Sequence, residues 1–267
     1  MLCLNRVLDL SRCSQNRSIS LQNQPNQTVS LGLMTKYWTP GSVKTRLGKT
    51  IGMAPAADLH QLFVSKLCDT LSTAADQRYL CITPNEHLSS VRLALENWQL
   101  SEKWQIVLQE PGDLGAKMSG WFRRVLGASG TDTAILIGGD CPLLCKEDIT
   151  QAVDRLSQFD VVLGPARDGG YYLIGITGPW RPELEAIFDQ IPWSTDQVLS
   201  ITRRKLATAN QAVSELEPRE DIDTERELIH LLQSQTQEQP MTSQHEDFFL
   251  AVNSILESSA LSDWRDR

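Results

Sequence analysis

The stretch Ala134-Ile-Leu-Ile-Gly-Gly-Asp-Cys-Pro142 decides the fold. Its first five residues form a compact apolar run that ends in glycine, which is the pattern of a strand covered on both faces. A run of the same kind, Asp160-Val-Val-Leu-Gly164, comes later in the chain. Between the two, residues 146–156 space their apolar side chains as an amphipathic helix does. A strand, a helix and a strand in this order predict parallel strands in one sheet.

The same alternation continues on both sides of this stretch. Strand-like runs are expected at 29–34, 79–83, 105–109 and 171–176, and amphipathic helices at 57–74, 88–98 and 117–126. The pattern predicts an α/β fold, in which a Rossmann-like, mostly parallel sheet carries helices on both faces. In such sheets ligands bind at the carboxyl ends of the strands, so we expect the ligand-binding and catalytic residues in the loops that follow the strands.

Composition and charge narrow the class of protein. A length of 267 residues, with 41% hydrophobic and 22% charged residues, is ordinary for a globular protein and favours one large domain. The net charge of −8, from 25 basic and 33 acidic residues, disfavours a nucleic-acid partner. No apolar run is long enough for a membrane span or a secretory signal, so we expect a soluble cytoplasmic protein with reduced cysteines. Nothing in the sequence predicts the oligomeric state.

The two ends of the chain differ from the middle. Residues 1–27 are polar and aperiodic and carry a single acid, which predicts a disordered N-terminal extension; an organelle transit peptide is the alternative. Residues 28–232 are expected to form the domain. Residues 233–267 predict a polar linker and a short C-terminal helix. The apolar residues of that helix would be Phe248, Val252, Ile255 and Leu256.

The first candidate loop, residues 39–47, comes shortly after the first expected strand. Pro40 and Gly41 predict a turn whose backbone can approach a ligand. Lys44 and Arg46 place two cations beside that turn, an arrangement that suits a di- or triphosphate. A basic, solvated loop is the alternative. The Walker A pattern of P-loop ATPases is absent.

A second candidate loop, residues 109–118, lies between an expected strand and the helix after it. Gly112 and Gly115 permit positive φ angles and a close approach of the backbone to a ligand. The N-terminus of the following helix would favour an anionic group. Glycine is common in loops of this kind, so an ordinary connection is the alternative.

Two aspartates stand at the ends of further strands. Asp140 follows the buried run at 134–138, and its carboxylate is a natural ligand for a Mg²⁺ or Mn²⁺ ion that bridges phosphate oxygens. The alternative is that Asp140 caps the next helix. Asp168 precedes Gly169 and Gly170 in a tight turn, where backbone and carboxylate would meet a substrate together. A plain hairpin turn is the alternative there.

Five motifs occur in a characteristic order: PGSVKTRL, PGDLGAKM, IGGDCPLL, LGPARDGGYYLIG and IPWSTDQVL. Their order and spacing resemble the glycosyltransferase-like family described as radical-SAM/selenodomain-associated transferase 1, over about residues 28–232. Members of that family look like GT-A glycosyltransferases of the nucleotide-diphospho-sugar transferase superfamily and are similar to nucleotidyltransferases. Gly139 stands where the family pattern has serine, a change that keeps the aspartate. The resemblance does not explain the first 27 residues.

The resemblance implies roles for residues in these motifs. Lys44 and Arg46 would contact the phosphates of a nucleotide. Asp140 would hold the metal ion. Asp113, with the glycines on either side of it, would form the loop that faces the base or the sugar.

Two further positions each have a structural alternative. The string Asp221-Ile-Asp-Thr-Glu225 is similar to one near the end of related nucleotidyltransferases, which would make Asp223 a second metal ligand. Thr224 followed by Glu227 fits a helix capping box equally well. Trp193 would stack on the sugar or ring of an acceptor, whereas a capping box from Ser194 to Gln197 would explain its segment by local helix chemistry.

These features together predict a metal-dependent glycosyltransferase that moves a sugar from a nucleotide sugar to a small acceptor. Asp140, Lys44 and Asp168 are the predicted catalytic residues, and Mg²⁺ or Mn²⁺ is the predicted cofactor. One alternative is a nucleotidyltransferase that joins an NTP to a phosphorylated small molecule and releases pyrophosphate. Another is a nucleotide-binding module without turnover. Four histidines have no partner arrangement and are given no catalytic role: His60, His87, His230 and His245.

Overall fold

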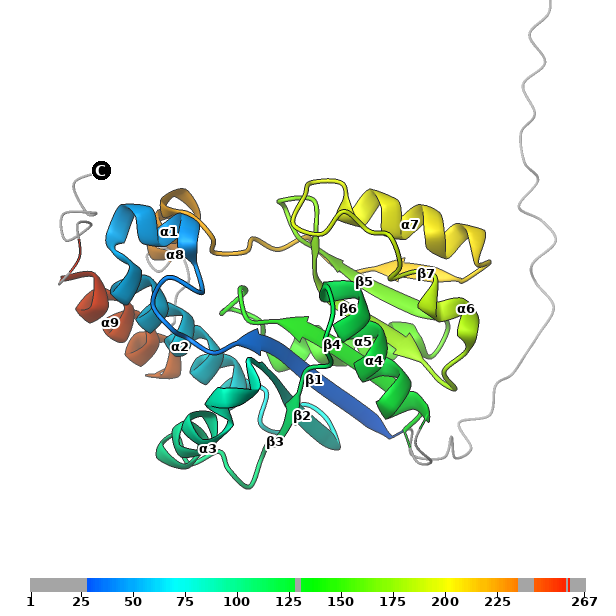
Figure 1. The fold of residues 1–267 in the computed structure, drawn as a ribbon, viewed down its shortest axis with the longest axis horizontal. Coiled ribbons are helices and arrows are strands. Elements are labelled where there is room, and N and C mark those ends of the chain that lie inside the picture. Colours follow the sequence, from blue (N-terminus) through cyan, green and yellow to red (C-terminus); the bar gives the residue numbers. More distant parts are fainter. Residues whose placement is uncertain (1–27, 128–130, 235–242, 258, 260–267) are drawn as a thin grey trace, which may run out of the picture.

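A seven-stranded sheet forms the centre of the protein in the computed structural model, which describes residues 28–127, 131–234, 243–257 and 259 (Figure 1). The extension predicted at residues 1–27 lies outside the described residues. The strands are β1 (Val29–Lys36), β2 (Gln77–Thr83), β3 (Gln105–Leu108), β4 (Thr133–Gly138), β5 (Val161–Pro165), β6 (Tyr171–Thr177) and β7 (Val213–Glu215). Their order across the sheet is β3-β2-β1-β4-β6-β5-β7.

The sheet is mostly parallel, as the sequence predicts. The pairs β1 with β2, β1 with β4, β2 with β3 and β5 with β7 are parallel. Strand β6 is the exception, because it runs antiparallel to both β4 and β5. The turn at Asp168 returns the chain directly from β5 into β6, and two strands joined by so short a turn pair antiparallel. The first residues of β6 therefore lie at the same edge of the sheet as the last residues of β4.

Helices cover both faces of the sheet. They are α1 (Thr45–Ile51), α2 (Met53–Thr70), α3 (Leu88–Asn97), α4 (Leu114–Gly127), α5 (Lys146–Leu156), α6 (Pro182–Glu185), α7 (Val198–Thr208), α8 (Glu225–Ser234) and α9 (Ser243–Glu257), with a short 3₁₀ helix η1 (Asn85–His87). Ile135 and Ile137 of β4 share one core cluster with residues of α2, α3 and α5. Ala134 and Leu136 share the other with residues of α4, α6 and α7. Alternate residues of one strand thus pack on opposite layers, as the apolar run predicts.

Two helices begin earlier than the sequence pattern predicts. Helix α4 begins at Leu114 because the Asp113 carboxylate accepts a hydrogen bond from the backbone N–H of Ala116, at 2.9 Å, and so caps the first turn. Helix α2 begins at Met53 although Pro55 follows, since the first turn of a helix does not need the N–H that proline lacks.

A third core cluster joins α1, α2, α8 and α9 at one end of the sheet (Figure 1). Phe63 of α2 lies beside Phe248 of α9, with 6.1 Å between the ring centroids. Val252 and Leu256 of α9 are buried in the same cluster. The apolar residues assigned to a C-terminal helix therefore lie on α9. The boundaries proposed for the domain and its tails stay a prediction.

We expect Phe248→Ala to lower the free energy of unfolding by about 3 kcal/mol, because removing a buried phenyl ring leaves a cavity between α2 and α9. Phe248 is 3% exposed. The matched control is Leu250→Ala on the same helix, since Leu250 is 66% exposed and its loss should change little. Urea unfolding measures both variants. Equal midpoints for the two would show that α9 contributes nothing to the stability of the fold.

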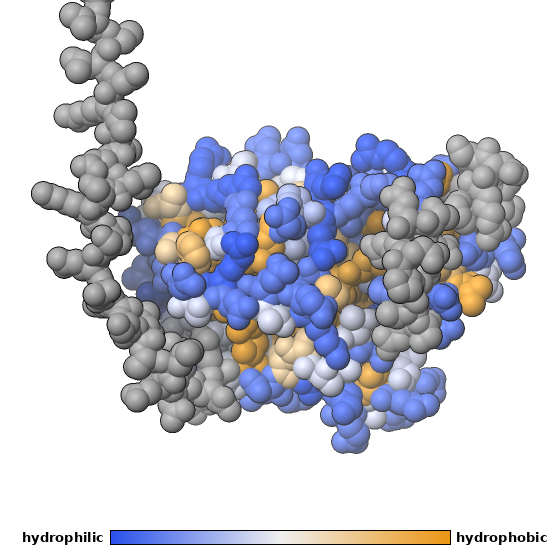
Figure 2. All heavy atoms as spheres, turned by 180° about the vertical axis from the view of Figure 1, so that it is seen from behind, coloured by the Kyte–Doolittle hydropathy of each residue, from blue (hydrophilic) through white to orange (hydrophobic). Residues whose placement is uncertain are grey.

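The outer surface is mainly polar. The face seen from behind is predominantly hydrophilic, with apolar residues in scattered patches (Figure 2). The exposed large apolar residues of the described chain each lie on a different element: Met53, Leu93, Leu108, Leu114 and Leu250. Among the described residues, no helix combines the length and apolar character that a membrane crossing requires.

Candidate active site

A cleft of about 890 Å³ opens at the edge of the sheet where β1 and β4 end. Residues 34–36 of β1 line it, together with Gly138 at the end of β4 and the two residues that follow. Tyr171 and Tyr172 reach the same cleft because β6 runs antiparallel and begins at this edge. The cleft therefore lies where ligands bind in open α/β sheets.

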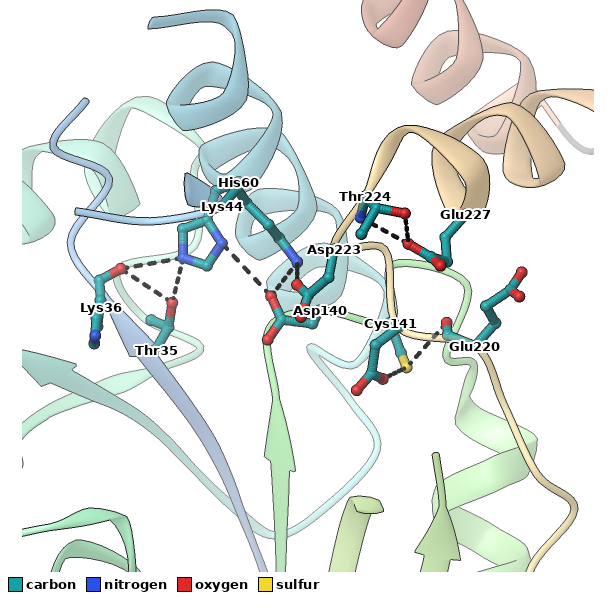
Figure 3. A network of polar contacts seen from close by, with 11 residues as sticks. Thr35, Lys36, Lys44, His60, Asp140, Cys141, Glu220, Asp223, Thr224 and Glu227 are labelled. Atoms are coloured by element: carbon teal, nitrogen blue, oxygen red, sulfur yellow. Dashed lines mark hydrogen bonds and ion pairs between the residues drawn. The ribbon is translucent and has the colours of Figure 1, made fainter. Parts of the chain in front are cut away.

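One lysine and two aspartates form a charged cluster in this cleft (Figure 3). The Lys44 ammonium contacts Oδ1 of Asp140 and also donates a hydrogen bond to Oδ1 of Asp223 at 3.0 Å. The Lys44 side chain is only 1% exposed, whereas those of Asp140 and Asp223 are 43% and 41% exposed. The lysine is thus enclosed by protein, and both carboxylates face the solvent of the cleft.

The chain reaches this cluster from three distant segments. Lys44 lies just before α1 with φ at 47° and ψ at 39°, a left-handed conformation that is uncommon for a residue other than glycine. Asp140 follows β4. Asp223 lies in the segment between β7 and α8, which is tied to the end of β4 because the Ile222 N–H donates to the Asp140 carbonyl at 3.0 Å. A left-handed backbone conformation such as that of Lys44 is strained, and strain of this kind concentrates at functional sites.

The pKa values of Lys44 and Asp140 are shifted by their surroundings. Burial by itself would lower the pKa of Lys44, but the carboxylates of Asp140 and Asp223 outweigh it and the pKa is raised. Loss of solvent around Asp140 would raise the pKa of that carboxyl, but Lys44 holds it below its ordinary value. Lys44 and Asp140 are therefore both ionised at neutral pH.

The two carboxylates have the chemistry of a site for a hard divalent cation. Both use Oδ1 toward Lys44 and both are about two-fifths exposed to the cleft. Carboxylate oxygens are the ligands that Mg²⁺ and Mn²⁺ prefer. In the described part of the chain no group of three or more His, Cys, Asp or Glu side chains is arranged to hold a metal ion by itself. Asp140 and Asp223 thus fit such an ion as two protein ligands, the number that Mg²⁺ commonly takes beside water and phosphate.

His60 of α2, to which the sequence motifs assign no role, lies at the same cleft. The residue is 6% exposed, and its Nδ1 lies 3.9 Å from Oδ1 of Asp140 (Figure 3). Its Nε2 is within hydrogen-bonding distance of the Thr35 hydroxyl, at 2.9 Å, and of the Lys36 carbonyl, at 3.2 Å. Burial lowers the pKa of His60, so the ring is neutral at neutral pH.

A further acid, Asp221, also lines the cleft. Its Oδ1 accepts a hydrogen bond from the buried Cys141 thiol at 2.7 Å. Burial raises the pKa of Asp221 to about 7, and the neighbouring carboxylates of Asp140 and Asp168 add to this shift while Cys141 opposes it. The resemblance to nucleotidyltransferases points to Asp223 in this string and not to Asp221.

We expect Asp221→Asn to flatten the pH dependence of stability. The folded protein keeps the Asp221 proton up to about pH 7, whereas the unfolded chain loses it near the ordinary value of 3.8. The unfolded state thus binds fewer protons between these values, so stability falls as the pH rises through that window. Urea unfolding across the window should show this fall in the wild type and less of it in the variant. Asp154→Asn, at an exposed site on α5, is the control, and equal slopes in all three proteins would contradict the prediction.

Most of the predicted site residues line the cleft. They are Lys44, Arg46, Gly112, Asp113, Asp140, Asp168, Gly170, Trp193 and Asp223. Pro40 and Gly41 form the predicted turn, in which the Ser42 N–H donates to the Thr39 carbonyl at 2.9 Å, but they are not among the lining residues. Whether the lining residues bind a ligand stays a prediction.

Two predicted glycines serve close packing instead of lining the cleft. A Cβ atom on Gly115 would lie 2.2 Å from the Phe188 carbonyl oxygen. Gly169 has φ at 94°, and a Cβ there would lie 2.3 Å from the Asp196 carbonyl oxygen. Both glycines let segments around the cleft approach one another, and a larger side chain at either would displace them.

Two of the structural alternatives raised for the loops are present alongside the cleft, and the one raised for Asp140 is wrong. Asp168 accepts a hydrogen bond from the Gly170 N–H at 2.8 Å, so it stabilises its own turn. Asp140 does not cap helix α5, because the N-cap residue of that helix is Cys145, whose backbone N–H donates a hydrogen bond to the Asp148 carboxylate. The Glu227 carboxylate accepts from the Thr224 N–H at 2.7 Å, which is half of the predicted capping box. That cap and the contact of Asp223 with Lys44 coexist.

The capping box predicted at Ser194 is absent, because helix α7 begins only at Val198. Ser194 has φ at 65°, a left-handed conformation that an N-cap residue does not adopt. Trp193 instead packs near the N-terminal turn of α4, where a Cβ on Gly115 would meet its ring at 3.0 Å. Local helix chemistry at Ser194 therefore does not explain the segment.

Sequence comparison matches the middle of the chain. A family model described as "Uncharacterized protein conserved in bacteria (DUF2064)" matches residues 67–195. A phosphoenolpyruvate guanylyltransferase from Chloroflexus aggregans (strain MD-66 / DSM 9485) is 27% identical in an alignment 132 residues long, which covers 43% of this chain and 65% of the relative. The chain thus spans less than two thirds of the length of that curated relative.

Solved structures match most of the chain. A "putative nucleotide-diphospho-sugar transferase" from Desulfovibrio desulfuricans G20 superposes with a TM-score of 0.75 at 28% identity, over 86% of this chain and 96% of that one. A 4-diphosphocytidyl-2C-methyl-D-erythritol synthase from Anaerococcus prevotii DSM 20548 shares the fold, with a TM-score of 0.52 at 10% identity, over 79% of this chain and 97% of that one.

These names agree with a transferase and support the superfamily that the sequence motifs resemble. None of them is the radical-SAM-associated name, which stays an expectation. The sheet order, the two helical layers and the superposition lead to one conclusion about architecture. This chain has the α/β, Rossmann-like fold of the nucleotide-diphospho-sugar transferases.

Proposed function

We propose that this protein is a metal-dependent nucleotidyltransferase, which joins an NTP to a small phosphorylated molecule and releases pyrophosphate. The observation that carries the proposal is the charged cluster, in which Lys44 is enclosed between two carboxylates that face an open cleft. A site for a polyanion and a divalent cation needs both kinds of charge at one place.

Each group of the cluster has a part in this reaction. Lys44 and Arg46 neutralise the phosphates, and Asp140 and Asp223 hold Mg²⁺ or Mn²⁺. The cation, when bound, stabilises the negative charge that grows on the departing pyrophosphate. An oxygen of the acceptor phosphate bonds to the α-phosphorus while the bond from that phosphorus to the oxygen bridging to the β-phosphate breaks. Asp168 and Trp193 line the same cleft, and we assign them to the acceptor.

Nucleotidyl transfer is preferred to glycosyl transfer on one ground. The curated relative is named a guanylyltransferase, and its match spans 132 residues at 27% identity. The sequence alone favours glycosyl transfer, and this remains the second candidate because the Desulfovibrio protein carries a sugar-transferase name at 28% identity. Both reactions need cations at the phosphates and a metal at Asp140, so the same residues serve either one.

Product analysis separates the two candidates. The full-length protein is incubated with Mg²⁺ or Mn²⁺, each of the four NTPs, and phosphorylated acceptors that include phosphoenolpyruvate. We expect pyrophosphate that depends on both the NTP and the acceptor, and none from the Asp140→Asn variant. A parallel series with nucleotide sugars tests the alternative. If the protein releases a nucleoside diphosphate and no pyrophosphate in either series, glycosyl transfer replaces nucleotidyl transfer as the proposed reaction. If neither series yields a product, the protein is a nucleotide-binding module without turnover.

A further inference from the structure

We infer that Gln109 selects the base of the nucleotide, and that the base it accepts carries an exocyclic amino group. The inference rests on the proposed function only in placing a nucleotide in the cleft, and it holds for nucleotidyl and glycosyl transfer alike. It goes beyond that proposal because it names a class of base and the residue that reads it. Neither the sequence motifs nor the contacts of the charged cluster assign a role to this glutamine.

Gln109 directly follows β3 and lines the cleft. Its backbone N–H donates to the Ile82 carbonyl at 3.0 Å, which continues the pairing of β3 with β2. Its side chain reaches further, because Nε2 donates to the Cys81 carbonyl of β2 at 2.8 Å and to the Thr35 carbonyl of β1 at 2.9 Å. The side-chain amide therefore lies across the ends of β1 and β2.

The two contacts of Nε2 fix the orientation of the amide. Carbonyl oxygens only accept hydrogen bonds, so both of them must face the NH₂ group of Gln109 and not its Oε1. The side chain cannot turn over without losing both bonds. Oε1 has no hydrogen bond with another described residue and is not one of the buried atoms, so it is open to the cleft that Gln109 lines. The cleft thus contains a hydrogen-bond acceptor in a fixed orientation.

The sheet order places this acceptor where a base would lie. Asp140 follows β4, whose neighbour is β1, and β2 is the next strand along the same edge. Neighbouring strands are about 4.8 Å apart, so the amide lies roughly 5 to 10 Å along the edge from the end of β4. Phosphates held at Lys44 and Asp140 therefore leave room for a ribose, with the base against Gln109. The opposite direction along the edge leads to β6 and the turn at Asp168, which we assign to the acceptor molecule.

A fixed acceptor distinguishes bases by the group that faces it. The exocyclic amino groups of adenine, cytosine and guanine donate hydrogen bonds, whereas uracil presents a carbonyl oxygen where cytosine carries its amino group. That carbonyl would place two acceptors against each other. A site built to hydrogen-bond a substrate group rejects an analogue that lacks the group, because a polar group of the site is then left unpaired. The inference therefore assigns nucleotides with an amino-bearing base to this cleft.

The test compares nucleotides that differ in one exocyclic group, bound to the full-length protein with Mg²⁺ and no acceptor molecule. The pairs are CTP with UTP, GTP with ITP, and ATP with purine riboside triphosphate, and isothermal titration calorimetry gives the dissociation constants. In the pair that contains the tightest-binding nucleotide, we expect loss of the amino group to weaken binding to the wild type about tenfold. Gln109→Met should reduce this ratio to about one.

The ratio separates a reading of the base from a merely structural role. Gln109→Met also removes the bonds to β1 and β2, but that loss weakens the binding of both nucleotides of a pair alike. Gln105→Met is the matched control and should keep the wild-type ratio, because Gln105 is exposed on the same strand and does not line the cleft. A tenfold ratio that survives in Gln109→Met would overturn the inference.

A measurement on the wild type tests Gln109 even if Gln109→Met fails to fold. The NMR signal of the ¹⁵N-labelled side-chain amide of Gln109 should shift more with the amino-bearing nucleotide of a pair than with its partner. Equal shifts, equal affinities within every pair, or no binding of any nucleotide would each overturn the inference.

The inference and the proposed function can fail separately. Pyrophosphate release by a wild type that does not distinguish the nucleotides of any pair would leave the proposed function standing and contradict the role of Gln109. Amino-dependent binding that Gln109→Met abolishes, in a protein that turns over no NTP, would support Gln109 and contradict the proposed function.

Discussion

Asp140→Asn is expected to reduce metal-dependent turnover by about 100-fold or more while the protein stays folded. Asparagine has nearly the size of aspartate and still accepts a hydrogen bond from Lys44. It lacks the charge that a hard cation requires. The variant should therefore lose its thermal stabilisation by Mg²⁺ or Mn²⁺ together with its activity.

Two measurements check this expectation. Pyrophosphate release with saturating NTP reports turnover, and the shift of melting temperature with added Mn²⁺ reports binding of the ion. Asp154→Asn is the control, because that aspartate is exposed on α5 and lies outside the cleft. Wild-type activity in Asp140→Asn would show that Asp140 is not a metal ligand in the working enzyme.

The sequence predicts the sheet well because its strands are buried on both faces. The run from Ala134 to Gly138 has no polar residue, and every residue before Gly138 is buried in β4. The end of such a strand is also easy to locate, which is why Asp140 could be placed at the cleft from sequence. The boundaries of α2 and α4 were less certain, since a cap by Asp113 and a proline in a first turn are local events that periodicity does not register.

The assembly of the site could not be predicted, because it depends on contacts between distant segments. Nothing in the string from Asp221 to Glu225 says that Ile222 will bond to the backbone of Asp140. One signal for His60 was available: it lies three, four and seven residues before Phe63, Val64 and Leu67, on the buried side of α2. A polar residue within such a face needs a partner, and its partners come from β1.

Lys44→Met is the second change with a large expected effect, and it should act on stability as well as on turnover. Methionine fills the enclosed space of Lys44 but leaves Asp140 and Asp223 facing each other without a cation. Losing one partner of a fully buried ion pair costs about 3 to 5 kcal/mol. The cost here should be smaller, because both carboxylates are about two-fifths exposed. A fall of a few degrees in melting temperature is expected.

The loss of stability in Lys44→Met should depend on pH, and the sign of this dependence is definite. In the wild type, Lys44 holds the pKa of Asp140 below its ordinary value, so the pair stabilises the fold above that value and the benefit disappears as the pH falls. Without Lys44 the two carboxylates repel each other, and the pKa of Asp140 should rise. The variant should therefore recover stability on acidification toward the ordinary carboxyl pKa, where the wild type begins to lose it.

Divalent cations should distinguish Lys44→Met from its control, Arg46→Met, most clearly. With the ammonium gone, Mn²⁺ can neutralise both carboxylates, so it should raise the melting temperature of Lys44→Met by more than it raises that of the wild type. Turnover should not return, because the phosphates of the NTP still lack the lysine. Arg46→Met is the control, since Arg46 lies two residues further along, in the first turn of α1, but is exposed. If Lys44→Met and Arg46→Met melt alike and respond alike to Mn²⁺, Lys44 is not the counter-ion that holds the two carboxylates together.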